Sequence, residues 1–349
     1  MSTAHSTSDA AAGSTPDAKR KTFVIVIASA VGVLLLVLFF FLINGSLAPE
    51  PKLAEFDISD SAVEMPKFSS PTTLEQPKGE KFSETKITIG DGSGFGDPPG
   101  CNTNLTVCLP AGYAEGDSRP CILMPPAHMN GLEGAKIDAR DAAEYEPYLQ
   151  AGYIVIAFDV DGPEGSGTDE LARHTQFRKA QAGMINARNA LEFALKQVPG
   201  VNPKQIYIVG HGSGGTLALL FAEHDTRLAG CIAFAPWTDR DYLNSDDDLA
   251  LHPSIKDLKA FNYAASPARY VSELSCPVFM FHAQDDSTVE IDQSQRFTDF
   301  ARESKKSIVL YSTGKGDHDD AIIKEGIPRS LKWLEKQKTA KPSGSAASQ

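Results

Sequence analysis

Residues 206–216 read Ile-Tyr-Ile-Val-Gly-His-Gly-Ser-Gly-Gly-Thr, and this stretch decides the fold. Its first four residues are apolar and mostly β-branched, which is typical of a buried strand. The small residues that follow permit a tight turn. Residues 216–223 then supply Ala, Leu and Phe without Gly or Pro, which predicts a helix. The stretch therefore predicts a buried strand, a tight turn and a helix that packs back on the strand.

This strand, turn and helix resemble the nucleophile elbow of the α/β-hydrolase superfamily. In that motif the residues two before and two after the nucleophile are small, because the strand and the helix approach each other there. Gly210 and Gly214 meet this requirement around position 212, whereas a nucleophile at Ser213 would put the bulky His211 at one of these sites. The resemblance thus places Gly212 where the family has its serine. It places Ser213 where the family uses a backbone N–H for the oxyanion hole.

Two further segments resemble the rest of the family's triad, in the chain order elbow, acid, histidine. Residues 278–289 read Val-Phe-Met-Phe-His-Ala-Gln-Asp-Asp-Ser-Thr-Val, and Asp286, three residues before the final valine, matches the triad acid. Residues 314–320 follow the last expected strand and carry His318 at the position of the catalytic base. A solvated turn aspartate is the alternative for Asp286, and the chain order favours the catalytic assignment of both residues.

Two other segments are candidates for the pocket around this triad. Residues 125–131 follow the third strand, and the resemblance implies that this loop supplies a second oxyanion N–H, with Ala127 as a candidate for the oxyanion hole or the pocket. His128 is a candidate pocket residue, and a surface loop position is the alternative for it. The loop lacks the His-Gly-Gly pattern of many esterases. An acidic segment, Trp237–Ala265, follows the sixth strand, where this fold often caps the pocket, and Trp237 is its candidate pocket residue. A solvated loop is the alternative for this segment.

Strands and helices alternate on both sides of the elbow, over residues 81–337. Strands are expected at 86–89, 104–109, 121–124, 153–158, 231–234, 278–282 and 307–311, and helices at 141–150, 176–197 and 321–336. Apolar strands separated by helices imply an α/β fold, with a mostly parallel sheet covered by helices on both faces. The resemblance is closest to the prolyl-oligopeptidase-like and dienelactone-hydrolase-like branches, which implies hydrolysis of esters or peptides.

The N-terminal 80 residues differ in composition from this domain. Residues 1–22 form a small, polar tail that ends in a basic triplet, and residues 23–43 carry no charge over a length that crosses a bilayer as a helix. The triplet predicts a cytoplasmic N-terminus and an extracytoplasmic domain, so we expect a single-pass membrane anchor. A cleaved signal peptide is the alternative. Residues 44–80 are expected to form a linker, and residues 338–349 a polar tail.

The chain has 349 residues and a formal net charge of −12. An acidic surface disfavours nucleic acid as a partner. Five cysteines are too few for a disulfide scaffold, and pairing of Cys101 with Cys108 is left open. The sequence has no Cys/His spacing typical of a zinc site, so neither a metal nor a cofactor is expected.

Three functions are compatible with these residues. The first is a serine hydrolase that uses Ser213 with His318 and Asp286 after a shift of the nucleophile by one residue. The second is a pseudoenzyme that has Gly212 in place of the nucleophile and binds a small ester-like or peptide-like ligand, or a protein partner. The third is hydrolysis by water that His318 and Asp286 activate directly. The missing serine at position 212 favours the pseudoenzyme.

Overall fold

The structure is a computed structural model and describes residues 73–79, 81–89, 103–114, 116–163, 169–241, 245 and 249–339. The predicted membrane segment 23–43, the tail before it and most of the predicted linker lie outside these residues and stay predictions. So does Cys101, and with it the pairing with Cys108. Within the described ranges, no helix is long and apolar enough to cross a bilayer.

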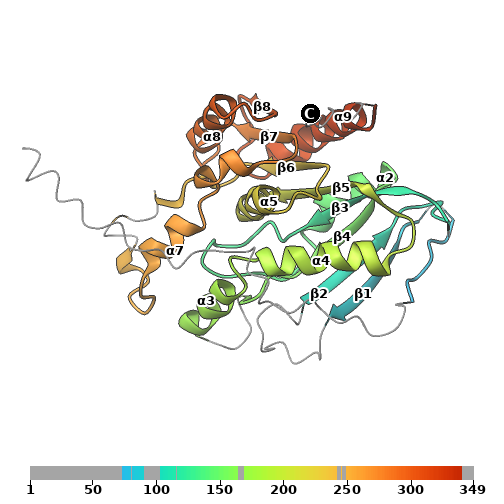
Figure 1. Ribbon diagram of the computed structural model, residues 1–349, viewed down its shortest axis with the longest axis horizontal. Coiled ribbons are helices and arrows are strands. Elements are labelled where there is room, and N and C mark those ends of the chain that lie inside the picture. Colours follow the sequence, from blue (N-terminus) through green and yellow to red (C-terminus); the bar gives the residue numbers. More distant parts are fainter. Residues whose placement is uncertain are drawn as a thin grey trace, which may run out of the picture. The chain divides into compact units, whose positions relative to one another are not determined.

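Eight strands of the described chain form one sheet in the order β1-β2-β4-β3-β5-β6-β7-β8 (Figure 1). β2 is antiparallel to both of its neighbours, whereas every pair from β4 to β8 is parallel. The strands are β1 Ser83–Ile89, β2 Thr103–Leu109, β3 Arg119–Met124, β4 Ile154–Phe158, β5 Val201–His211, β6 Gly230–Phe234, β7 Val278–Ala283 and β8 Ile308–Thr313. The predicted α/β-hydrolase fold, with its mostly parallel sheet, is confirmed.

Side chains of the central strands alternate between two apolar cores, one on each face of the sheet. The helices are α2 Ala142–Gln150, α3 Glu170–Lys179, α4 Met184–Gln197, α5 Ser213–His224, α7 Leu258–Ala264, α8 Ile291–Glu303 and α9 Ile327–Thr339, with short turns η2 Pro267–Arg269, η3 Val271–Glu273 and η4 Ile322–Gly326. On β5, Ile206 and Ile208 enter the core under α4 and α5, and Tyr207 and Val209 enter the core under α2 and α9. Burial on both faces explains the uninterrupted apolar runs in the strands.

One predicted helix is two helices in the structure. The sequence predicts a continuous helix over residues 176–197, but a turn at 180–183 separates α3 from α4. Backbone φ is positive at residues 181–183, which is incompatible with a right-handed helix. A Cβ on Gly183 would lie 2.8 Å from the side chain of Leu217 on α5, so this turn packs closely against the elbow helix. The apolar spacing continues across the turn because the turn is itself buried, and the helical prediction was therefore wrong there.

Candidate active site

Gly212 forms the sharp turn between β5 and α5. Its backbone has φ +54° and ψ −121°, a conformation that residues with a side chain rarely adopt. A Cβ on Gly210 would lie 2.1 Å from the carbonyl oxygen of Gly214, and a Cβ on Gly214 would lie 2.6 Å from that of Pro126. Both positions therefore require glycine. The tight elbow expected from residues 206–216 is present, and Gly212 is at its apex.

His318, in the loop between β8 and η4, faces this apex. Its Nδ1 lies 2.8 Å from Oδ2 of Asp286. Because an ionised carboxylate only accepts hydrogen bonds, Nδ1 carries the proton, and Nε2 is the nitrogen that points elsewhere. A Cβ on Gly212 would lie 3.1 Å from this Nε2. Three segments that are distant in sequence, around residues 212, 286 and 318, thus meet at one point.

Hydrogen bonds hold both carboxylate oxygens of Asp286. Oδ1 accepts the backbone N–H groups of Thr288 and Val289, at 2.9 and 2.8 Å. Oδ2 lies 3.2 Å from Nε2 of His282, in addition to its contact with His318. Burial alone would raise the pKa of Asp286, but the hydrogen bonds from His282, His318 and Val289 outweigh burial and hold this pKa well below its ordinary value. The carboxylate is therefore ionised at neutral pH and orients the ring of His318.

Replacing Asp286 by asparagine is expected to lower the free energy of unfolding by about 3 kcal/mol at pH 7, because the buried His282 and the half-buried His318 lose their charged partner. A depressed carboxyl pKa stabilises the fold above the pKa of the unfolded chain, about 4, and this contribution is lost as the pH falls through the folded pKa. The deficit of Asp286→Asn relative to wild type should therefore shrink below pH 4. Urea unfolding at pH 7 and at pH 3 measures both effects.

Asp299→Asn is the control for this measurement. Asp299 is 68% exposed at its side chain and pairs with Arg302 at 3.5 Å. Exposed pairs of this kind contribute little, so the variant should unfold within about 0.5 kcal/mol of wild type at either pH. Equal stability of Asp286→Asn and wild type at pH 7 would contradict the ionised, hydrogen-bonded state of Asp286.

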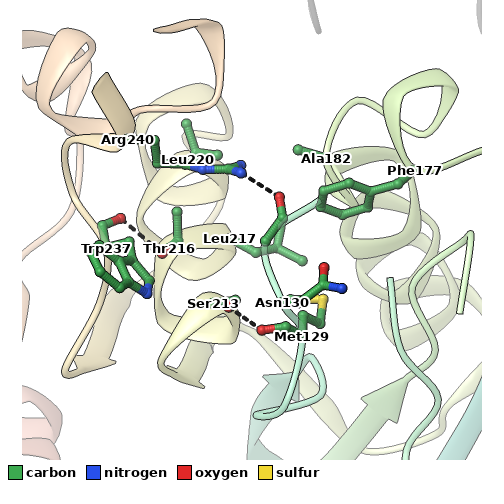
Figure 2. A pocket seen from close by; sticks show the side chains of 11 residues that line it. Met129, Asn130, Phe177, Ala182, Ser213, Thr216, Leu217, Leu220, Trp237 and Arg240 are labelled. Carbon is green, nitrogen blue, oxygen red and sulfur yellow. Dashed lines mark hydrogen bonds between the residues drawn. The ribbon is translucent and has the colours of Figure 1, made fainter. Parts of the chain in front are cut away.

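Ser213 is the first residue of α5, one position beyond the apex. Its hydroxyl donates a short hydrogen bond to the carbonyl oxygen of Met129 (Figure 2). No hydrogen bond joins this hydroxyl to His318 in the described part of the chain. Its backbone N–H belongs to the first turn of the helix, where the N–H groups have no intrahelical acceptor. This N–H, rather than the hydroxyl, is the group of Ser213 that the elbow geometry offers to a ligand.

The loop 125–131 passes beside the elbow, but the backbone N–H of its candidate oxyanion residue is already hydrogen-bonded. The backbone N–H of Ala127 donates to Oδ1 of Asp141 at 3.1 Å. The carbonyl oxygen of Ala127, rather than its N–H, lies 3.4 Å from a Cβ position on Gly212. The side chain of His128 is exposed, with its ring centroid 6.4 Å from that of His211. The structure thus brings both predicted residues near the elbow, with the Ala127 N–H already paired.

A cavity of about 100 Å³ lies next to Ser213 (Figure 2). Its walls come from α5, the loop after β3, the α3–α4 turn and the segment after β6. The lining residues are Met129, Asn130, Gly131, Phe177, Ala182, Ser213, Thr216, Leu217, Leu220, Trp237 and Arg240. Of the four predicted pocket residues, Ser213 and Trp237 line this cavity, whereas Ala127 and His128 do not. The segment that begins at Trp237 therefore supplies part of a pocket wall.

His211 brings a second imidazole to the elbow. It is 2% exposed, its Nδ1 lies 2.8 Å from Glu144 on α2, and its ring centroid lies 4.5 Å from that of His318. Burial lowers the pKa of His211, but Glu144 and the charge of Asp319 outweigh burial and raise it above its ordinary value. Among the described residues, His211, His318 and Asp319 are the group that could hold a metal ion, since their donor atoms lie within 4.8 Å of one another.

Residues 141–339 match the model of the prolyl oligopeptidase family. The match covers more than half of the chain and includes the elbow, Asp286 and His318. The chain belongs to the prolyl oligopeptidase family.

Sequence relatives of this prolyl oligopeptidase family member include hydrolases. The lysophosphatidylserine lipase ABHD12 of Danio rerio is 26% identical over 209 residues, which are 54% of this chain and 49% of the relative. The carboxylic ester hydrolase LipM of Mycobacterium tuberculosis, whose assignment is described as probable, is 26% identical over 168 residues, which are 40% of this chain and 38% of LipM. The chain spans about half the length of these curated relatives, or less.

Solved structures of other proteins have the same fold. The acylaminoacyl peptidase of Pyrococcus horikoshii superposes with a TM-score of 0.60 at 17% identity, covering 76% of this chain and 43% of that chain. A protein of Klebsiella pneumoniae assigned as a dienelactone hydrolase superposes with a TM-score of 0.52 at 16% identity, covering 73% of this chain and 99% of that chain. At these identities the likeness shows the fold alone.

Three polar residues of the candidate active site of this prolyl oligopeptidase family member were not predicted from the sequence. Glu144 contacts His211, His282 contacts Asp286, and Arg240 lines the cavity. His282 had a signal, because it is a polar residue inside the apolar strand run of β7 and is fully buried there. No pattern in the sequence marks Glu144 or Arg240 in this way, since each lies in a segment of mixed polarity and reaches the site only through the tertiary fold.

Proposed function

We propose that this chain binds a small ester-like or peptide-like ligand at the elbow without forming a covalent intermediate. One observation carries the proposal. Gly212 has no side chain at the point where Nε2 of His318 lies 3.1 Å from a Cβ position. A serine hydroxyl needs to be within hydrogen-bond reach of its base to act as a nucleophile. Gly212 occupies the nucleophile position in this proposal, so the acyl-enzyme route is lost.

The contacts of Ser213 argue against a nucleophile shifted by one residue. Its hydroxyl is engaged by the carbonyl oxygen of Met129, and its backbone belongs to the first turn of α5. To reach His318, the side chain would have to leave this bond and the helix would have to rotate. Gly210 and Gly214 leave no room for such a rotation, because their backbones are already in contact.

The rest of the site suits the binding of a polarised carbonyl group. The N-terminal turn of α5 presents N–H donors and the positive end of the helix dipole. His318 keeps its protonated Nδ1 on Asp286 and its Nε2 toward the apex. Together these groups would hold a carbonyl oxygen and a neighbouring hydrogen-bond donor of the ligand.

A hydrolase is the second candidate, favoured by the retained His318–Asp286 pair and by relatives named as a lipase and as an ester hydrolase. In this alternative His318 activates water directly or Ser213 acts as the nucleophile. Catalysis without a triad serine is limited to about 10³–10⁴ over the uncatalysed reaction. The two candidates therefore differ in covalent chemistry and in rate.

Labelling of the wild-type chain by a fluorophosphonate, followed by intact-mass measurement, tests the proposal. No covalent adduct is expected, and Ser213→Ala should match wild type in its rate of 4-nitrophenyl butyrate hydrolysis within about twofold. A wild-type adduct that maps to Ser213 and disappears in Ser213→Ala would overturn the proposal and establish the shifted nucleophile. Hydrolysis that persists in Ser213→Ala but is lost in His318→Gln would instead favour activated water.

A further inference from the structure

Arg240 crosses one end of the cavity beside Ser213 (Figure 2). It is 3% exposed, although arginine is among the residues least often buried. One terminal nitrogen donates to the carbonyl oxygen of Gly131, and the guanidinium lies 5.2 Å from the ring centroid of Phe261. These contacts fix the position of the side chain but bring no negative charge to it.

The charge of Arg240 has no carboxylate partner within the described part of the chain. Its neighbour Asp241 pairs with Arg269, and Glu133, near the same loop, pairs with Arg173. Burial alone acts on Arg240 and lowers its pKa to about 10, so the guanidinium stays charged at neutral pH. A buried charge without a counterion is costly, and proteins rarely keep one unless a ligand supplies the opposite charge.

The remainder of the cavity is apolar or already hydrogen-bonded. The hydroxyl of Ser213 donates to Met129, and that of Thr216 donates to the carbonyl oxygen of Trp237 at 2.8 Å. Most of the other walls are hydrocarbon or aromatic, and Arg240 is the only charged residue in the described lining. A ligand that enters therefore meets an apolar channel with one positive charge at its end. The volume of about 100 Å³ suits a short chain rather than a lipid tail.

We propose that this cavity binds a carboxylate at the end of a short apolar chain, with the carboxylate paired to Arg240. The opposite end of the ligand, an ester or amide carbonyl, lies at the Gly212 elbow. A single buried cation selects a monoanion, and the planar guanidinium matches a carboxylate. The inference rests on the proposed binding function of the elbow and names its ligand class.

Paired ligands test the inference on the wild-type full chain. The probes are monomethyl glutarate and methyl 5-methylhexanoate, in which an isopropyl group replaces the carboxylate. Binding is followed by calorimetry and by fluorescence of Trp237, which lines the cavity. The carboxylate ligand is expected to bind at least tenfold more tightly than its neutral counterpart. Equal affinities of the two ligands, or tighter binding of the neutral one, would overturn the inference without any variant being made.

Arg240→Gln separates a ligand-binding role from a structural one. We expect the variant to lose at least tenfold in affinity for monomethyl glutarate, to bind the neutral ester as wild type does, and to keep or raise the Tm. Arg240→Lys should restore part of the preference. A large fall in Tm with an unchanged preference would mean that Arg240 only braces the loop at Gly131. If wild type hydrolyses the esters, the proposed function fails, and the preference is then measured as a ratio of kcat/KM.

Discussion

A serine at position 212 is expected to give this chain esterase activity, with Gly212→Ser hydrolysing 4-nitrophenyl butyrate at least about 10³-fold faster than wild type. The Cβ position lies 3.1 Å from Nε2 of His318, whose Nδ1 is already held by Asp286. In the proposed function the hydroxyl is the member of the triad that is missing, and a complete triad contributes about 10⁶ in rate in well-studied serine hydrolases. Since φ is +54° at this position, the new side chain is expected to cost about 1–2 kcal/mol of stability.

Gly212→Ala is the matched control for this gain of function. Alanine imposes the same backbone strain and a similar contact with His318, but it has no hydroxyl. It should lose stability to the same extent as Gly212→Ser and remain without turnover. Adding His318→Gln to Gly212→Ser should remove the new activity. A folded Gly212→Ser variant as inactive as Gly212→Ala would show that more than the nucleophile has been lost.

The largest loss of stability is expected from Gly210→Ala, about 4 kcal/mol or more. The added Cβ would lie 2.1 Å from the carbonyl oxygen of Gly214 and 2.3 Å from its carbonyl carbon. Both atoms belong to the backbone of α5, so neither can move aside as a flexible side chain would. The strand and the elbow helix would have to separate, and both belong to the apolar core. Changes of this size are exceptional for a single methyl group and identify a rigid backbone contact.

Gly314→Ala is the control, because an added Cβ there has no neighbour within 4 Å and the backbone φ is ordinary. It should unfold within about 0.5 kcal/mol of wild type. Thermal and urea unfolding of the three proteins measure the difference. A Gly210→Ala variant as stable as Gly314→Ala would mean that β5 and α5 are not locked together at the elbow.

The fold could be predicted from the sequence because its evidence is local. Buried parallel strands appear as short apolar runs, and the elbow appears as small residues at fixed spacing around position 212. The register of the elbow was predicted from one steric argument, that His211 does not fit where Gly210 does. The structure has the close backbone contact between Gly210 and Gly214 on which that argument depends. The positions of Asp286 and His318 followed from chain order within the resemblance.

The cavity could not be predicted, because its walls meet only in the folded chain. Arg240 and Met129 line the cavity with Ser213 but lie in other segments of the chain. Nothing in the sequence around either residue distinguishes it from a residue of a solvated loop. The break between α3 and α4 was missed for a related reason. Tertiary packing against Leu217, rather than a local Pro or an exposed polar residue, stabilises that turn.

The turn between α3 and α4 has a consequence for how this site can diverge. Phe177, near the end of α3, and Ala182, in the turn itself, form one wall of the cavity, and Trp237 and Arg240 form another. Neither wall belongs to the sheet, whereas the elbow, Asp286 and His318 are anchored at the ends of strands. Substitutions in the walls can therefore change the length and charge of the cavity while the elbow keeps its geometry. In the proposed function, the residues that select the ligand and the residues that contact its carbonyl group therefore lie on separate parts of the molecule.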